Sequence, residues 1–90
     1  MNFEAIQQDE KQYMMQAYGR FPVALVSGKG AVATDVSGKE YVDFTSGIGV
    51  NSLGYCDEGW TKAVSVQAAT LQHISNLYYS PLQTEVAKTL

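Results

Sequence analysis

The sequence predicts an α+β fold: a helix, then a three-stranded antiparallel meander, then two further helices. Two observations lead to this prediction. The spacing of apolar residues changes from about 3.6 to about 2 and back again, which indicates helix, strand and helix in turn. Gly- and Ser-rich breaks also divide the β region into short segments, which favours tight hairpins. We expect the 90 residues to form one small domain or part of one.

The first helix is predicted to begin after Asn2, a good N-cap residue. Apolar side chains then recur at helical spacing among Gln, Asp, Glu and Lys residues: Phe3, Ile6, Tyr13, Met14 and Ala17. Gly19 is the expected stop, because glycine commonly follows the last helical turn. Such a short helix is marginal alone, so its apolar stripe needs a partner surface.

Three β segments are expected between the first helix and Ser46. The first covers Val23–Val26 and is broken by Ser27–Gly30. The second covers Ala31–Val36, and the turn Ser37–Lys39 separates it from the third, which covers Glu40 to Phe44. Because turn residues occupy both breaks, a three-stranded antiparallel meander is the economical interpretation.

The remainder predicts a glycine-rich loop and two helices. Residues 47–54 hold three glycines and no regular element. A second helix follows the acidic pair Asp57-Glu58, with a stripe made of Trp60, Val64, Ala68, Leu71 and Ile74. Residues 80–83, Ser-Pro-Leu-Gln, are typical of a capping box with proline at the first helical position. The last helix stops mid-pattern at Leu90, which indicates either a piece of something longer or a helix that frays.

Composition excludes several classes of function. Net charge is −3, with 6 basic and 9 acidic residues, so no basic patch is available for nucleic acid. The apolar stretches are too short to span a bilayer. The single cysteine, Cys56, cannot form an internal disulfide, which fits a reducing cytoplasmic location.

Two segments are candidate binding sites. Residues 46–51, Ser-Gly-Ile-Gly-Val-Asn, could let the backbone approach a ligand closely, with Asn51 adding a hydrogen-bonding amide. The residues alone favour the plainer interpretation, in which the glycines serve only the path of a strand-to-helix connection, and the segment is not a dinucleotide fingerprint. Residues 76–79, Asn-Leu-Tyr-Tyr, could line a polar site, or the rings could pack as a lid over the core.

No catalytic, cofactor-binding or metal-binding residue is predicted from the residues alone. His73, near the expected end of the second helix, has no triad partner nearby, and one His with one Cys makes no metal site. Acidic neighbours disfavour a thiolate at Cys56. Asp35 and Asp43 are expected to be turn or strand-face carboxylates. The five lysines fall in polar stretches or turns, unsuited to Schiff-base chemistry.

The order of several separated motifs adds a family resemblance. Tyr18-Gly-Arg-Phe-Pro-Val-Ala-Leu-Val26 precedes Gly38-Lys-Glu-Tyr-Val-Asp-Phe44, then come Ser46-Gly-Ile-Gly-Val-Asn51 and Ser75-Asn-Leu-Tyr-Tyr79. From about Tyr13 to Leu90 this closely resembles the start of class III, fold-type I pyridoxal-phosphate aminotransferases. Many relatives carry Gly-His-x-His-Pro where this chain has Gly-Tyr-Cys-Asp-Glu at residues 54–58, so the chain departs from the family pattern there.

The resemblance implies a homodimeric cytoplasmic enzyme that moves an amino group between N-acetylornithine and 2-oxoglutarate, in arginine biosynthesis. Residues 1–90 would form the N-terminal arm and part of the small domain. The large domain with its cofactor groups would lie downstream, and the 90-residue chain alone would be inactive and would not bind pyridoxal 5'-phosphate. Four residues would face the amino substrate: Gly47, Ile48, Asn76 and Tyr79. Ornithine or succinyl-diaminopimelate could be the amino donor instead, and a stand-alone binding or interaction module is the alternative from another class.

Overall fold

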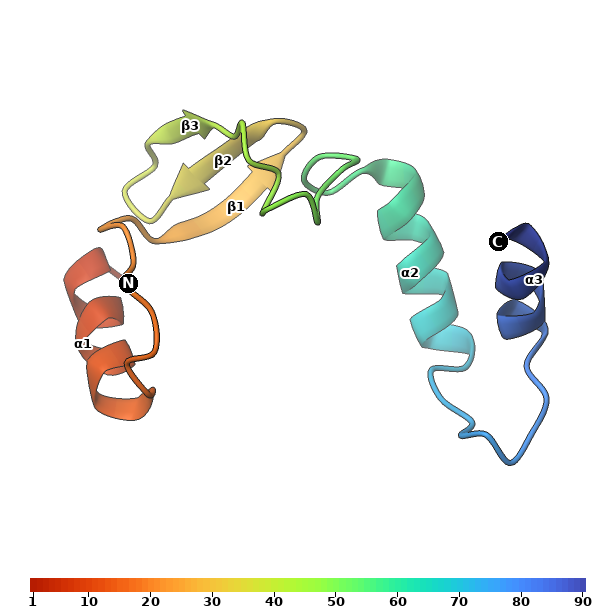
Figure 1. Cartoon of the computed structure of the whole chain (residues 1–90). Helices are drawn as coiled ribbons and strands as arrows, with labels where there is room; N and C mark the ends of the chain where they lie inside the picture. The colour runs from red at the N-terminus through yellow and green to blue at the C-terminus, as the bar shows by residue number, and fades with distance from the viewer. The chain divides into compact units, whose positions relative to one another are not determined.

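The computed structural model describes all residues from Met1 to Leu90. The elements are α1 (Phe3–Tyr13), β1 (Leu25–Lys29), β2 (Val32–Asp35), β3 (Glu40–Val42), α2 (Glu58–Thr70) and α3 (Pro81–Thr89) (Figure 1). The expected order of helix, antiparallel meander and two helices is therefore confirmed. The chain divides into two compact units, Met1–Asp57 and Glu58–Leu90.

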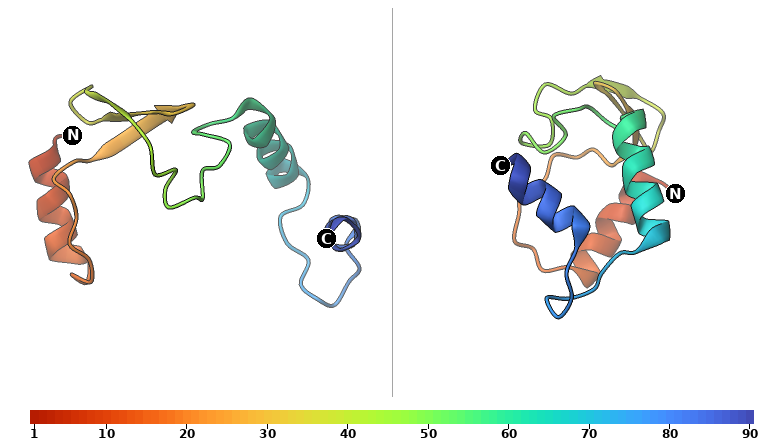
Figure 2. Two further views of the ribbon diagram at one scale, coloured as in Figure 1. Left: turned by 45° about the horizontal axis from the view of Figure 1, so that its top comes forward. Right: turned by 90° about the vertical axis from the view of Figure 1, so that its right-hand side faces the viewer.

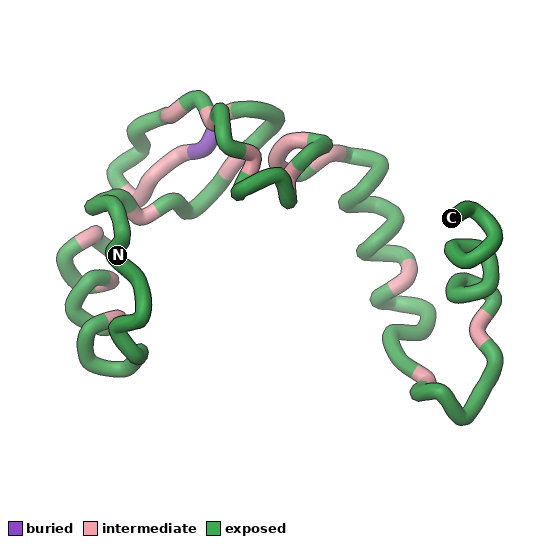
Figure 3. Tube along the Cα trace, in the orientation of Figure 1, coloured by how far each residue is buried: buried purple, intermediate pink, exposed green.

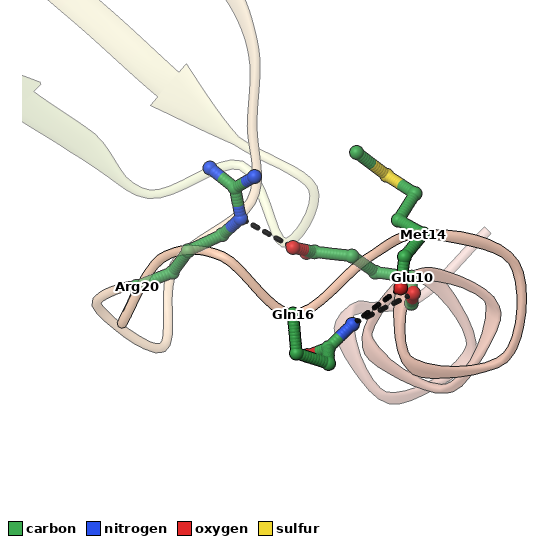
Figure 4. Close-up of polar contacts among 4 residues, drawn as sticks. All are labelled: Glu10, Met14, Gln16 and Arg20. Atoms are coloured by element: carbon green, nitrogen blue, oxygen red, sulfur yellow. Dashed lines mark hydrogen bonds and ion pairs between the residues drawn. The ribbon is translucent and has the colours of Figure 1, made fainter.

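Helix α1 begins where the sequence predicts and ends earlier. The Asn2 side chain accepts a hydrogen bond from the Ala5 amide at 2.9 Å, as an N-cap does. The prediction that Gly19 ends the helix is wrong, because the last helical residue is Tyr13. The Gln16 amide donates to the carbonyls of Glu10 and Met14, at 3.1 and 3.0 Å, and so satisfies carbonyls at the helix end (Figure 4).

The turn after α1 is held by an ion pair. Arg20 Nε donates to the Glu10 carboxylate, which brings the chain leaving the helix back alongside it (Figure 4). Because both side chains are partly exposed to solvent, this pair contributes little stability. It links α1 to the segment that leads into β1.

The sheet has the order β1-β2-β3, and both pairings are antiparallel. The break predicted at residues 27–30 is misplaced: β1 continues through Ser27 and Gly28 to Lys29, and the reversal occurs at Gly30-Ala31. Gly30 has φ +58°, which allows a two-residue turn there. A register irregularity lies between Leu25 and Ser27.

The third strand is shorter than predicted, ending at Val42 rather than Phe44. The Asp43 amide still donates to the Ala31 carbonyl at 2.8 Å, so the chain leaves the sheet only after this residue. Phe44 is 92% exposed. No neighbouring side chain covers Phe44, so burial of its ring does not stabilise a strand at this residue. The predicted strand pairing therefore stops early.

In the second unit, α2 ends at Thr70, so the predicted stripe running on to Ile74 is wrong. The Gln67 amide donates to the Leu71 carbonyl at 2.7 Å and caps the helix end. His73 consequently lies in the connector 71–80 and not on a helix. Helix α3 begins as predicted, with Ser80 Oγ accepting from the Gln83 amide at 3.4 Å. The left view of Figure 2 shows α3 nearly end-on, with the connector as an open loop.

Very little of the chain is buried. Ala33 on β2, 2% exposed, is the one fully buried hydrophobic residue (Figure 3). Helix α1 makes no element-to-element contact with the sheet, and α2 makes none with α3. Apolar side chains of all three helices are therefore left largely to solvent, which is unusual for a self-sufficient domain. No helix combines the length and apolarity that a membrane crossing requires.

Candidate functional site

The glycine loop, residues 46–51, forms a left-handed turn. Ser46, Gly47 and Ile48 have φ of 53°, 59° and 59°, and Gly49 follows at 83°. Two hydrogen bonds close the turn: the Gly49 amide to the Thr45 carbonyl at 3.1 Å, and the Asn51 amide to the Ser46 carbonyl at 2.8 Å. The turn presents the Ile48 side chain outward, 97% exposed.

This conformation is costly for two of its residues. A β-branched residue such as Ile48 rarely has positive φ, and Ser46 is only slightly better suited. Each such residue costs on the order of 1–3 kcal/mol and persists only where its surroundings hold it. Glycine at 47 carries no such cost, and a Cβ there would lie 3.0 Å from Asn51 Nδ2. The backbone path thus gives a second reason for Gly47, besides space for a substrate.

The carboxylate of Asp43 holds the start of this loop. Its Oδ1 accepts from the Thr45 amide at 2.7 Å, the Thr45 hydroxyl at 2.9 Å and the Ser46 amide at 3.0 Å. Its Oδ2 accepts from the Tyr55 hydroxyl at 2.6 Å. Asp43 therefore connects β3, the loop and the segment that follows the loop.

Tyr55 is itself fixed to the sheet. Its carbonyl accepts from the Gly30 amide at 3.0 Å, and its amide donates to the Gly30 carbonyl at 2.8 Å. Its ring lies on Gly28 of β1, where an added Cβ would come within 2.6 Å of the ring. Only glycine leaves room for the ring at that position.

A second carboxylate of the same kind lies in the β2–β3 turn. Asp35 Oδ1 accepts from the Ser37 amide at 2.8 Å, the Ser37 hydroxyl at 2.7 Å and the Lys39 amide at 3.0 Å. Its Oδ2 accepts from the Tyr41 hydroxyl at 2.9 Å. Both Asp35 and Asp43 accept hydrogen bonds from the residues of a turn, which agrees with the prediction of turn or strand-face carboxylates.

Hydrogen bonding shifts the titration of these four groups. The pKa of Asp35 is lowered to about 2, first by the Ser37 hydroxyl, and that of Asp43 to about 2, first by the Tyr55 hydroxyl. The pKa of Tyr41 is raised first by its hydrogen bond to Asp35, and that of Tyr55 first by its hydrogen bond to Asp43, because each carboxylate holds the phenol proton. Both carboxylates are thus charged at neutral pH and act as acceptors.

A cavity of about 330 Å³ lies beside the glycine loop. It lies between the β1–β2 turn and the loop, and polar groups of the loop face it, including Ser46 and Asn51. Asp43 and Tyr55 also line it. Sequence reasoning noted Asn51 here but missed Tyr55, because that residue appeared only as a departure from the family pattern.

The tyrosine connector lies in the second unit. Asn76 and Tyr79 line one hollow of about 830 Å³ between the end of α2 and the start of α3, together with His73. Ser75 has φ 60° there, and its hydroxyl accepts from the Leu77 amide at 3.2 Å. Tyr79 is fully exposed, at 103%. The alternative of a tyrosine lid over the core therefore does not hold for Tyr79 within this chain.

The four predicted substrate-facing residues fall into two pairs. Gly47 and Ile48 are neighbours in the glycine loop of the first unit, whereas Asn76 and Tyr79 line the hollow of the second. Cys56 is exposed, and all five lysines are exposed as well. No group of three or more His, Cys, Asp or Glu side chains is arranged to hold a metal ion.

Comparison with known proteins identifies the family. The sequence pattern described as Aminotransferase class-III matches residues 13–90. The chain is 47% identical over 88 residues to acetylornithine aminotransferase of Methanosarcina acetivorans, which covers 98% of the chain and 22% of that protein. The corresponding enzyme of Methanocaldococcus jannaschii is 51% identical over 81 residues, 90% of the chain and 20% of that protein.

Solved structures agree with the sequence comparison. Acetylornithine aminotransferase from Elizabethkingia anophelis matches with a TM-score of 0.94 at 28% identity, covering 98% of the chain and 22% of that structure. Ornithine aminotransferase from Toxoplasma gondii ME49 matches with a TM-score of 0.88 at 29% identity, covering 99% and 22%. The chain spans about a fifth of the length of the curated relatives it matches. The chain belongs to the class III aminotransferases.

Proposed function

We propose that this chain is the N-terminal arm and part of the small domain of a longer acetylornithine aminotransferase. The complete protein transfers an amino group between N-acetylornithine and 2-oxoglutarate and serves arginine biosynthesis. The observation that carries this proposal is the identity of 44–51% to proteins of that name over most of the chain. The scarcity of buried residues supports a role as part of a larger fold, and counts against a stand-alone module.

Pyridoxal 5'-phosphate is the cofactor that the family implies for the complete protein. When bound, it would supply an electron sink for the negative charge that develops at the carbon bearing the transferred amino group. The residues of this chain do not fit the cofactor by themselves. All five lysines are exposed, and none lies in an apolar setting that would favour a Schiff base. We therefore assign the cofactor groups to the rest of the protein.

In the complete protein, this segment would supply residues that face the substrate. The glycine loop offers its backbone at Gly47 and the side chain of Ile48, and the connector offers the Asn76 amide and the Tyr79 phenol. A glycine at 47 leaves space for a bulkier, acylated substrate. The phenol and amide supply hydrogen-bonding groups suited to a polar, uncharged part of the substrate. In the complete protein, a homodimer in the cytoplasm would cover the apolar faces left open here.

A chimera tests the function directly. This chain would replace the matching 22% of the Methanosarcina acetivorans enzyme, and amino transfer to 2-oxoglutarate would be measured with three donors. We expect N-acetylornithine to have a higher kcat/KM than ornithine or succinyl-diaminopimelate. The unsubstituted Methanosarcina enzyme is the control. A chimera that folds and binds the cofactor, yet prefers ornithine, would contradict the proposal. It would favour an ornithine aminotransferase instead, and solved ornithine aminotransferases also resemble this chain.

The 90-residue chain on its own should neither transaminate nor form an adduct with the cofactor. Its exposed lysines differ little from one another, so none should react selectively. The test is borohydride reduction in the presence of pyridoxal 5'-phosphate, followed by mass spectrometry. A stoichiometric adduct at one lysine would show that this segment carries a cofactor site of its own.

A further inference from the structure

Asp43 and Tyr55 form a bracket around the glycine loop. The loop begins three residues after Asp43 and ends four residues before Tyr55, and the two side chains meet at 2.6 Å. We propose that these two are positioning residues that hold the glycine loop in its left-handed turn and so set the substrate-facing backbone at Gly47 and Ile48. The substrate part of this inference rests on the proposed function. The positioning part rests on the geometry alone.

Asp43 divides its two oxygens between two tasks. Oδ1 receives three hydrogen bonds from Thr45 and Ser46, the residues that enter the left-handed turn. Oδ2 receives only the Tyr55 hydroxyl. Bonds to an ionised carboxylate are shorter and stronger than neutral ones, so Oδ1 can offset part of the cost of positive φ at Ser46.

Tyr55 gives the bracket a fixed end. Two backbone hydrogen bonds hold it to Gly30, and its ring rests on Gly28, where no side chain could be accommodated. Gly54, at φ +84°, brings the backbone close to Gly30. A Cβ added at residue 54 would lie 2.9 Å from the Gly30 carbonyl oxygen. The phenol is therefore presented to Asp43 from the β1–β2 hairpin and not from a free loop.

The chain contains a matched control. Asp35 and Tyr41 repeat the arrangement almost atom for atom, with three bonds at Oδ1 and a phenol at Oδ2. This second pair holds the β2–β3 turn, and none of its hydrogen bonds reaches the glycine loop. Tyr41→Phe and Tyr55→Phe thus each remove one phenol-to-carboxylate hydrogen bond. Only Tyr55→Phe removes the bond that belongs to the bracket.

The first measurement is amide hydrogen exchange in the chimera described above, where the rest of the fold is present. In Tyr55→Phe, exchange at the Ser46, Gly49 and Asn51 amides should accelerate about tenfold, the size expected when a hydrogen bond to a charged group is lost. In Tyr41→Phe those three amides should change by less than about twofold, while the Lys39 amide accelerates. Equal acceleration of the loop by both substitutions, or an unprotected loop in the unsubstituted chimera, would overturn the proposal.

The second measurement is kinetic, in the active chimera described above. Tyr55→Phe should raise KM for the amino donor about tenfold with kcat and cofactor absorbance nearly unchanged, because ground-state positioning is lost. Tyr41→Phe should change neither by more than about twofold. If Tyr55 had a merely structural role, the two substitutions would lower the activity of the chimera alike. That result would overturn the substrate part of the proposal. An unsubstituted chimera without transaminase activity would refute the proposed function, and the exchange result would still decide the positioning role.

Discussion

Replacement of Gly28 by alanine should open the hairpin locally, although the backbone itself can accept alanine. The added Cβ would lie 2.6 Å from Tyr55 Cγ, 2.9 Å from its Cβ and 3.0 Å from its Cδ2, whereas carbon atoms pack best at about 3.5–4.0 Å. Tyr55 cannot withdraw freely, because Gly30 holds its backbone and Asp43 holds its hydroxyl. Overpacking of this kind costs about 1–3 kcal/mol.

Amide exchange at Gly30 and Tyr55 measures this cost, since those two amides close the bridge. A loss of about 1–3 kcal/mol corresponds to exchange about 5- to 150-fold faster. Gly19→Ala is the matched control, because nothing lies within 4 Å of its Cβ position, and it should leave the bridge unchanged.

A double substitution isolates the clash. With Tyr55→Ala already present, Gly28→Ala should cost much less than it does beside the intact ring, because the atoms that would overlap are gone. An equal cost in both backgrounds would refute the steric reasoning. It would place the effect of alanine in the strand backbone instead.

Three further predictions follow from the exposed surface and the paired carboxylates. Because the pKa of Asp35 and of Asp43 falls from 3.8 to about 2 on folding, their contribution to stability is complete above pH 3.8 and lost as pH falls toward 2. Titration followed by the Ser37 and Ser46 amide shifts should show midpoints near 2, and midpoints at 3.8 would contradict the hydrogen-bonded geometry. In the chimera, Tyr79→Phe should lower kcat/KM for the amino donor about tenfold and leave cofactor binding unchanged, and an unaltered kcat/KM would make Tyr79 structural. The 90-residue chain should self-associate in sedimentation runs across a concentration series, burying more than about 1,000 Å² if the contact is specific, and a clean monomer at high concentration would count against this. Six apolar side chains that the structure leaves unburied should drive this association: Phe3, Ile6, Met14, Leu82, Val86 and Leu90.

The positions where sequence reasoning failed are the ends of elements and the path of the loop. Gly19 and Ile74 looked like the natural limits of two helices, yet each helix ends four residues or more before them. In both cases a glutamine side chain donates at the helix end: Gln16 folds back onto the carbonyls of Glu10 and Met14, and Gln67 reaches forward to the carbonyl of Leu71. A flexible amide several bonds from the backbone leaves no periodic trace in a sequence.

The candidate site divides in the same way. Glycines at 47 and 49 indicated a loop with unusual dihedrals, and the structure has them at φ +59° and +83°. The positive φ at Ser46 and Ile48 was not predictable, because neither residue favours it by itself. At Ser46 the backbone amide donates to Asp43, whose other oxygen accepts from Tyr55 beyond the loop, so the groups around this residue come from both sides of the loop.

The sequence by itself determined the type and order of the elements, the caps at Asn2 and Ser80, and membership of the class III aminotransferases. Caps and periodicity depend on residues within one or two turns of each other, so local chemistry decides them. Only the tertiary structure decided that Tyr55 lies on Gly28 and donates to Asp43. Those contacts join residues far apart in the chain, and they exist only once the hairpin has turned at Gly30 and brought their backbones together.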